Sequence, residues 1–182
     1  MAQTNLDQGV ARAARASAAG YRIRGPDIND AAEIGRVHLA VWGQAYVGIL
    51  PEDYLASLTV ESNIARWQHL LASDEADRVD RLVGLAPDGS IVGLVAWGAS
   101  RDDDPAAPSE LHAIDILESH HGSGLADLLL SNSIGFVGAQ MLWVLVVNER
   151  AQACYRRYIF VDEGTRQHHD LFNAELLLMT RD

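Results

Sequence analysis

The sequence predicts a single-domain mixed α/β protein, and three observations support this. The chain has 182 residues, 48% of them hydrophobic, which is enough for one substantial core and too few for two. Segments with the 3.6-residue period of helices alternate with shorter apolar segments typical of strands. Two of these strands flank the turn tripeptide Pro87-Asp88-Gly89, which predicts a hairpin and therefore antiparallel pairing in the sheet.

The N-terminal segment, residues 1–20, is rich in alanine and also contains arginine and serine. It lacks the apolar centre of a secretory signal and carries Asp7. We therefore expect a mobile N-terminal tail or a short helix here, with the folded domain spanning residues 21–182.

The first half of the domain is predicted to be mostly helical. A short strand at residues 21–24 precedes a helix within 27–46, whose apolar residues recur at helical spacing. A second helical region covers residues 50–73, with Pro51 at a first helical position and Thr59 as an N-cap.

The second half alternates strands and helices. The strand at 141–147 is so evenly apolar that we expect both its faces to be covered. The predicted elements are, in order, a hairpin over 81–98, a polar connector at 100–109, a strand at 110–117, a helix from 125, the strand at 141–147, a helix at 148–158, and strands at 159–164 and 174–181.

Charge and cysteine content exclude several classes of partner. The net charge of −11 argues against nucleic acid and against an anionic membrane surface. The longest apolar runs, at 91–98 and 141–147, fall well short of the ~20 residues that span a bilayer. The single cysteine, Cys154, cannot form an internal disulfide, so a cytoplasmic location is expected.

The stretch HHGSGLADLLL, residues 120–130, places two glycines in the turn between a predicted strand and a predicted helix. The unpaired N–H groups at such a helix start suit an anion. A P-loop would need Gly-Lys followed by Ser or Thr, and a dinucleotide-binding fingerprint would have Gly or Ala in place of Asp127. The glycine spacing alone leaves open both a phosphate site and an ordinary strand-to-helix turn.

Combined with the later stretch NERAQACYRRYIF, this turn resembles the GNAT superfamily of acetyl-CoA-dependent N-acetyltransferases. The likeness extends upstream to residues 40–58, which look like the first helices of small bacterial members, and covers about residues 21–180. The family's central pattern is Arg or Gln, two residues, Gly, one residue, then Gly or Ala, and it falls on His121, Gly124 and Ala126. Its later pattern of Asn, Ala and Tyr falls on Asn148, Ala151 and Tyr155.

Two positions depart from the family pattern. His121 replaces the usual Arg or Gln, although backbone amides make much of the family's phosphate contact. Ile159 stands where members usually have glycine, and a β-branched residue disfavours a positive φ. We therefore expect the chain to leave the last helix by a different geometry.

The resemblance implies a GNAT-like fold with a central mixed, mostly antiparallel sheet of about six to seven strands, splayed in the middle and flanked by about four helices. It also implies acetyl-CoA as acyl donor, with the backbone of Ile114 and Ile116 pairing with pantetheine and Asn148 contacting the same arm. The implied cofactor-binding residues are Ile114, Ile116, His121, Gly122, Ser123, Gly124, Leu125, Ala126 and Asn148. No metal is implied; the doublet His120-His121 lacks zinc-ligand spacing, as does His168-His169, which we expect in a surface turn.

By the same resemblance, Tyr155 is the acid that protonates the leaving thiolate, since a phenol of pKa near ~10 is protonated at neutral pH. The alternative is an aromatic residue at the edge of the core. For the base, Glu110 and Asp115 are rival candidates, and an ordered water or a merely solvated Glu110 stays open. Trp42 and Tyr46 are candidates for the acceptor pocket, or for the core.

Two features of the last helix stay ambiguous. Arg150, Arg156 and Arg157 suit either the 3′-phosphate of CoA or the C-terminus of their own helix. Cys154 is better explained as a small buried residue than as an acyl-carrying nucleophile.

The predicted function is direct transfer of acetyl from acetyl-CoA to a primary amine of a small molecule or peptide. The alternative is a non-catalytic acyl-CoA-binding or interaction module on the same fold. The terminal strand, residues 174–181, offers an edge through which a homodimer could form.

Overall fold

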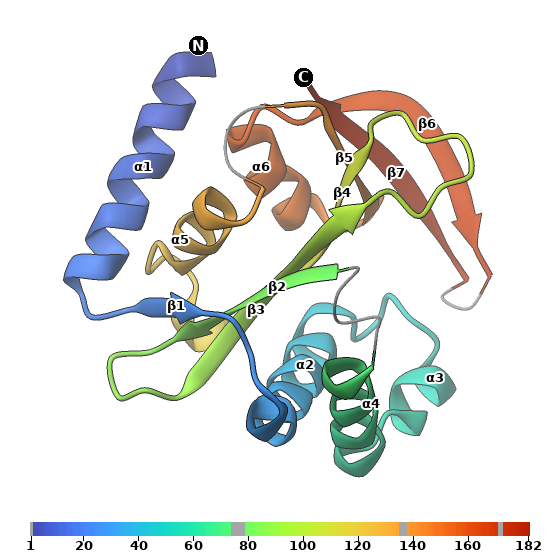
Figure 1. Ribbon diagram of the computed structural model, residues 1–182. Coiled ribbons are helices and arrows are strands. Elements are labelled where there is room, and N and C mark those ends of the chain that lie inside the picture. The colour runs from blue at the N-terminus through green and yellow to red at the C-terminus, as the bar shows by residue number, and fades with distance from the viewer. Residues whose placement is uncertain (1, 74–78, 135–137, 171–172) are drawn as a thin grey trace.

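A single seven-stranded sheet organises the molecule, and the computed structural model describes residues 2–73, 79–134, 138–170 and 173–182 (Figure 1). The strand order is β1-β2-β3-β4-β5-β7-β6, and every neighbouring pair is antiparallel except β4 and β5. This confirms the predicted mixed α/β fold. The strands are β1 (Arg22–Arg24), β2 (Val79–Leu85), β3 (Ile91–Ala99), β4 (Ser109–Ile116), β5 (Gln140–Leu145), β6 (Val161–His169) and β7 (Ala174–Arg181).

Helices cover both faces of the sheet. In Figure 1, α2 and α4 lie on one side, whereas α1, α5 and α6 lie on the other. Consecutive residues of β3 show the division, because Leu94 packs with Ile34 of α2 while Val95 packs with Leu129 of α5. The helices are α1 (Ala2–Ala18), α2 (Ala31–Ala45), α3 (Glu52–Ser57), α4 (Val60–Ala72), α5 (Leu125–Asn132) and α6 (Glu149–Arg157), with 3₁₀ turns at Ile28–Asp30 and Glu118–His120.

Several local predictions are confirmed. Thr59 caps α4, with its side chain accepting from the Ser62 N–H at 3.1 Å in a capping box. The β2–β3 hairpin closes through the Ala86 N–H, which donates to Ser90 O at 2.9 Å. Among the described residues, every helix falls short of the length and apolar character that a membrane span requires.

Two predictions about the C-terminal strands are wrong. The terminal strand β7 offers no free edge, because it is hydrogen-bonded to β5 on one side and to β6 on the other. His168 and His169 are the last two residues of β6 rather than a surface turn, and they pair with Glu175 and Ala174. Strand β6 therefore forms one edge of the sheet, opposite β1. Its residues are mostly charged or polar, and such residues commonly protect an exposed edge from pairing with another chain.

Of the two alternatives for the N-terminal segment, a mobile tail or a short helix, the structure shows a helix. It forms the helix α1, which packs along α5 (Figure 1). The side chains of Ala13 and Ala16 are 8% and 0% exposed, and Gly9 is buried on the same face. These small residues recur at helical spacing and let the two helix backbones approach closely. The docking of this helix was not predicted, because alanine and glycine form a weak apolar stripe, which only a close partner helix can bury.

The docking of α1 can be tested with one buried and one exposed alanine. Ala16→Glu places a carboxylate in a fully buried position and is expected to lower the free energy of unfolding by about 3 kcal/mol or more. Ala14→Glu changes an exposed position of the same helix and should stay within about 0.5 kcal/mol. Urea unfolding followed by circular dichroism measures both, and equal effects would contradict the docked helix.

The parting of β4 and β5 is the feature that shapes the site. The two strands pair only at Ser109 with Gln140 and at Glu110 with Met141, after which they separate. On its other side β4 stays paired with β3 along its length, with a bulge that leaves His112 without an opposite residue. Beyond Glu110, the edge of β4 that faces β5 is therefore open, as the family resemblance implies for a sheet splayed in the middle.

Candidate functional site

A groove of about 1510 Å³ lies where β4 and β5 separate. Its walls come from α2, α4, β4, the glycine turn and α6. Of the residues predicted from the sequence, the groove is lined by Trp42, Tyr46, Ile114, Ile116, His121, Gly122, Gly124, Leu125, Ala126, Asn148 and Tyr155. Ser123 and Glu110 are not part of the lining.

The open edge of β4 presents the backbone of Ile114 and Ile116. The Leu117 N–H donates to Val92 O of β3 at 3.0 Å. Because successive residues of an antiparallel strand alternate in direction, Asp115 also bonds toward β3, whereas Ile114 and Ile116 face the opening. The carbonyl of Ile116 already accepts from the His121 ring at 2.9 Å, so Ile114 is the residue with both backbone groups directed into the opening.

The glycine turn lines the groove with backbone whose N–H groups are largely unused. Gly122 and Gly124 have φ of 77° and 89°, and Gly124 is the N-cap of α5. Among the described residues, no acceptor bonds to the amides of Gly122, Gly124 or Ala126. Ser123 fixes the turn instead of lining the groove, since its hydroxyl donates to His120 O at 2.7 Å and accepts from the Leu125 N–H at 3.2 Å. The turn therefore offers the donors that an anionic group requires.

Hydrogen bonds from both histidine side chains stabilise the conformation of the turn. The His120 ring bonds to the Tyr21 hydroxyl at 2.9 Å, and the His121 ring donates to the backbone of Ile116. His121 thus stabilises the geometry between the strand and the turn. The presence of His121, where the family usually has Arg or Gln, leaves the backbone donors of the turn in place.

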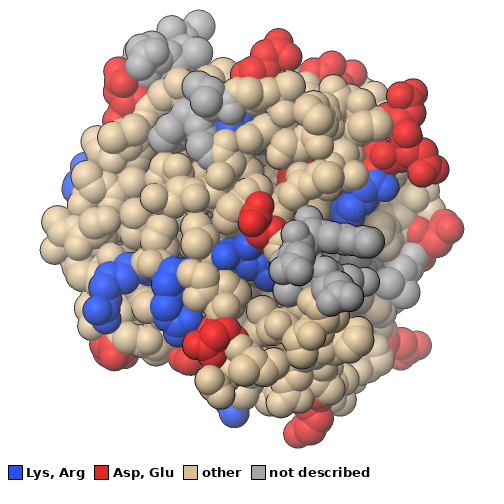
Figure 2. Space-filling view, in the orientation of Figure 1, with Lys and Arg blue, Asp and Glu red and all other residues tan. Residues whose placement is uncertain are grey.

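Basic side chains gather in the groove of this acidic protein. In Figure 2, most acidic side chains lie around the rim of the face shown, whereas basic groups also lie within it. Three carboxylate residues line the groove among those the structure describes, Asp115, Glu118 and Asp127. The arginines that line it are Arg12, Arg66, Arg81, Arg101, Arg150 and Arg157. The local charge therefore suits an anionic ligand despite the net charge of −11.

Helix α6 begins beside the groove at Asn148. The Asn148 side-chain oxygen accepts from the Ala151 N–H at 3.1 Å and so caps the helix. Arg150 and Arg157 face the groove, whereas Arg156 donates to Gln152 at 3.0 Å. Burial raises the pKa of the Cys154 thiol, which keeps it protonated and a poor nucleophile.

The chain leaves α6 through a residue with positive φ, a geometry that we did not expect at a β-branched residue. Ile159 adopts φ of 68°, although it is β-branched. The Phe160 N–H donates to Tyr155 O and the Ile159 N–H to Arg156 O, both at 3.2 Å, which is the Schellman pattern with Ile159 at the left-handed position. These two bonds and the 1% exposed Phe160 ring outweigh a backbone cost of about 1–2 kcal/mol.

Tyr155, in the last turns of α6 before this exit, lines the groove. Its ring packs against Phe160 at 6.1 Å between centroids. Burial raises the pKa of the Tyr155 phenol well above its ordinary value, with smaller contributions from Cys154, Tyr46 and Asp115. The phenol is consequently protonated throughout the neutral range.

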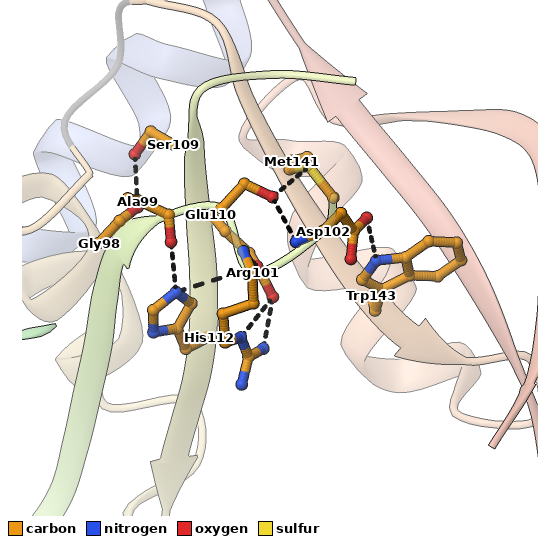
Figure 3. A network of polar contacts seen from close by, with 10 residues as sticks. Gly98, Ala99, Arg101, Asp102, Ser109, Glu110, His112, Met141 and Trp143 are labelled. Carbon is orange, nitrogen blue, oxygen red and sulfur yellow. Dashed lines mark hydrogen bonds and ion pairs between the residues drawn. The ribbon is translucent and has the colours of Figure 1, made fainter. Parts of the chain in front are cut away.

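Glu110 is buried in an ion pair rather than solvated or open to the groove (Figure 3). Its side chain is 1% exposed, and the Arg101 N–H donates to Oε2 at 2.9 Å while the Arg101 guanidinium donates to Oε1. Arg101 comes from the connector before β4, where Asp102 also accepts from the Trp143 indole at 3.0 Å. The carboxylate of Glu110 therefore does not line the groove and can influence it only through the residues that contact it.

His112 is the neighbour of Glu110 that faces the groove, and sequence analysis missed it. It occupies the bulge in β4, and its Nε2 donates to Ala99 O at 3.1 Å and lies 3.9 Å from Glu110 Oε2 (Figure 3). With a carbonyl at Nε2, the lone pair of the neutral ring is on Nδ1. Burial lowers the pKa of His112, Arg101 lowers it further, and the Ala99 carbonyl and Glu110 partly oppose this. The ring is therefore neutral at pH 7.

Asp115, the rival candidate base, is paired with a second histidine that the sequence analysis missed. Asp115 Oδ2 accepts from His38 Nδ1 of α2 at 3.0 Å, and both side chains are buried. His38 Nε2 lies 3.5 Å from an Arg66 nitrogen. The pair joins positions 38 and 115, so no local sequence signal could have found it.

Trp42 and Tyr46 form an aromatic wall at the α2 side of the groove. Their ring centroids are 5.1 Å apart, and Trp42 lies 5.0 Å from His38 and 6.4 Å from Tyr54. Burial, with a smaller contribution from Asp115, raises the pKa of Tyr46 to about 12. Both residues are half-buried and pack beside Leu50, so they combine a core contact with a surface that lines the groove.

Comparison with known proteins identifies the class as N-acetyltransferases. A curated protein of Bacillus subtilis (strain 168), the uncharacterized N-acetyltransferase YuaI, is 28% identical over 133 residues, which is 69% of this chain and 72% of that protein. The solved PaiA N-acetyltransferase of Thermoplasma acidophilum in complex with coenzyme A has a TM-score of 0.64 at 18% identity, covering 88% of this chain and 99% of that one. A spermidine N-acetyltransferase SpeG mutant of Vibrio cholerae has a TM-score of 0.60 at 16% identity, covering 89% and 93%.

The acetyltransferase (GNAT) family model matches residues 45–159. The chain belongs to this family and is an N-acetyltransferase. The match begins inside α2, so α1 precedes the matched segment.

Two glycines of the turn give a matched pair of variants. In Gly122→Ala the added Cβ has no atom within 4 Å, so the only cost is that of a left-handed backbone at an alanine. We expect the free energy of unfolding to fall by about 1 kcal/mol. At Gly124 an added Cβ would overlap the Arg12 carbonyl oxygen and lie 3.3 Å from Ala16 Cβ. Gly124→Ala should therefore cost about 3 kcal/mol or more. Urea unfolding compares the two, and a smaller loss for Gly124→Ala would contradict the contact with α1.

Proposed function

We propose that this protein transfers the acetyl group of acetyl-CoA directly to a primary amine of a small molecule or peptide. The observation that carries the proposal is the open edge of β4 beside a turn of unpaired amides, in one groove with Tyr155. The neighbour solved with coenzyme A supports the choice of donor, and the spermidine N-acetyltransferase neighbour supports an amine acceptor. Both give support by fold alone, since their identities are 18% and 16%.

The groove fits the donor along its length. The amides of Gly122, Gly124 and Ala126 suit the pyrophosphate, and Arg150 and Arg157 add positive charge nearby. The backbone of Ile114 suits the amides of pantetheine as an added strand, and the Asn148 amide nitrogen, which has no acceptor among the described residues, suits the same arm. The thioester then lies between β4 and α6, near Tyr155.

The transfer needs one base and one acid. The neutral amine attacks the thioester carbonyl, a C–N bond forms, the C–S bond breaks, and the amine proton must leave. Tyr155 gives its phenolic proton to the departing thiolate, which yields the acetamide and free CoA. The protonated Cys154 thiol argues for direct transfer rather than an acyl-enzyme.

For the base we propose His112, with Glu110 as its positioning partner. His112 lines the groove, and Nδ1 of its neutral ring carries a lone pair that no described residue engages, whereas both oxygens of Glu110 are engaged by Arg101. Glu110 lies 3.9 Å from Nε2 and stabilises the imidazolium that forms when the amine proton is taken up. The Trp42 and Tyr46 wall is the proposed contact surface for the acceptor.

Replacing Tyr155 by Phe tests the acid. We expect kcat to fall by about 10²-fold or more, because the thiolate must then leave unprotonated, while the Kd for CoA stays within about threefold. Tyr46→Phe is the control and should change KM for the amine more than kcat. Steady-state kinetics with thiol detection and calorimetry measure these quantities, and an unchanged kcat in Tyr155→Phe would remove Tyr155 from the mechanism.

The pH profile tests the base. Since His112 must be unprotonated and its pKa is lowered, kcat/KM should rise with pH through a midpoint below about 6.5. Arg101→Gln removes a charge that lowers this pKa and should move the midpoint up, whereas Glu110→Gln removes a charge that raises it and should move the midpoint down. His112→Gln should lose this limb and about 10²-fold in rate. Identical midpoints in all four proteins would rule out His112.

A further inference from the structure

A buried carboxylate lies directly behind the glycine turn. Asp127 occupies the first turn of α5, three residues after Gly124, and is 3% exposed. A carboxylate at a helix N-terminus stabilises the helix. Here it also lies beside the amides proposed to hold a pyrophosphate, where an uncompensated negative charge would repel the ligand.

Helix α1 supplies the charge that compensates Asp127. Arg12 Nε donates to Asp127 Oδ1 at 2.9 Å, and the Tyr158 hydroxyl donates to the same oxygen at 2.7 Å. The Arg12 side chain is 24% exposed and lines the groove. Among the described residues, Asp127 is the acceptor that Arg12 uses, and it takes only Nε, so the two terminal nitrogens of the guanidinium keep their donors for a ligand in the groove.

The backbone of α1 is also fitted to the turn. The carbonyl of Arg12 lies against the Cα of Gly124, where only a glycine has room, and Ala16 packs beside it. Arg12 is therefore fixed at its backbone, which contacts Gly124, and at its Nε, and it lines the same groove as Gly122 and Gly124.

We propose that Arg12 is a ligand of the coenzyme pyrophosphate, so that α1, which precedes the family-matched segment, is part of the coenzyme site. The proposal rests on the proposed function. Asp127 orients the guanidinium through Nε and balances its charge, and the terminal nitrogens donate to phosphate oxygens. A charge-assisted contact of this kind corresponds to about a tenfold change in Kd or more.

The experiment is calorimetric titration of the full chain with CoA and with 3′-dephospho-CoA, which keeps the pyrophosphate. Arg12→Gln should weaken both ligands by about tenfold, whereas Arg15→Gln, on an exposed position of the same helix outside the groove lining, should stay within about twofold. Because Arg12→Gln leaves Asp127 buried without its cation, Asp127→Asn and the double variant Arg12→Gln/Asp127→Asn are measured beside it, with thermal unfolding to confirm that each protein is folded.

The double variant separates a direct contact from charge compensation. If Arg12 contacts the pyrophosphate, the double variant should bind CoA about tenfold more weakly than Asp127→Asn. Equal binding by those two proteins would show that Arg12 only neutralises Asp127 and would overturn the proposal, as would a loss seen with CoA and absent with 3′-dephospho-CoA. Wild-type protein that binds neither ligand would overturn the proposed function, and this inference with it; a wild type that binds and an Arg12→Gln variant that binds equally would overturn this inference alone.

Discussion

The site depends on where the pairing between β4 and β5 stops. Two residue pairs join these strands, and beyond Glu110 the backbone edge of β4 is open. An unpaired edge in the middle of a sheet is costly unless something completes its hydrogen bonds, and here the helices α5 and α6 flank the opening instead of closing it. The same parting lets a ligand reach the strand, the glycine turn and Tyr155 within one groove.

Each wall of that groove is fixed by contacts away from the open edge. The glycine turn is held by Ser123, by both histidine rings and by α1, so no ligand is needed to shape it. Tyr155 is fixed by the Schellman exit of α6, even though that exit places Ile159 in a strained backbone region. Preorganised donors of this kind cost little reorganisation when an anion binds or charge develops.

Much of the fold could be predicted from the sequence because its signals are local. The hairpin around Pro87-Asp88-Gly89, the Thr59 cap and the evenly apolar strand β5 follow from turn chemistry, capping and periodicity. The direction of the Ile114 and Ile116 backbone follows from the resemblance to a family whose sheet is splayed. The Ile159 exit was wrongly predicted because backbone propensity was weighed without the two hydrogen bonds and the buried Phe160 ring that oppose it. Three features depend on tertiary contacts, which helical period and residue type do not predict. These are the docking of α1, the His38–Asp115 pair and the Arg101–Glu110 pair.

If acetyl-CoA occupies the opening between β4 and β5, as we propose, amide hydrogen exchange measured with and without saturating acetyl-CoA will change at the residues that line this opening. We expect slower exchange at Ile114 and across the turn of residues 121–126, where unpaired amides would gain acceptors, and unchanged exchange in the hairpin turn at residues 86–90. Unchanged exchange at Ile114 and in the turn, with acetyl-CoA bound, would contradict this proposal.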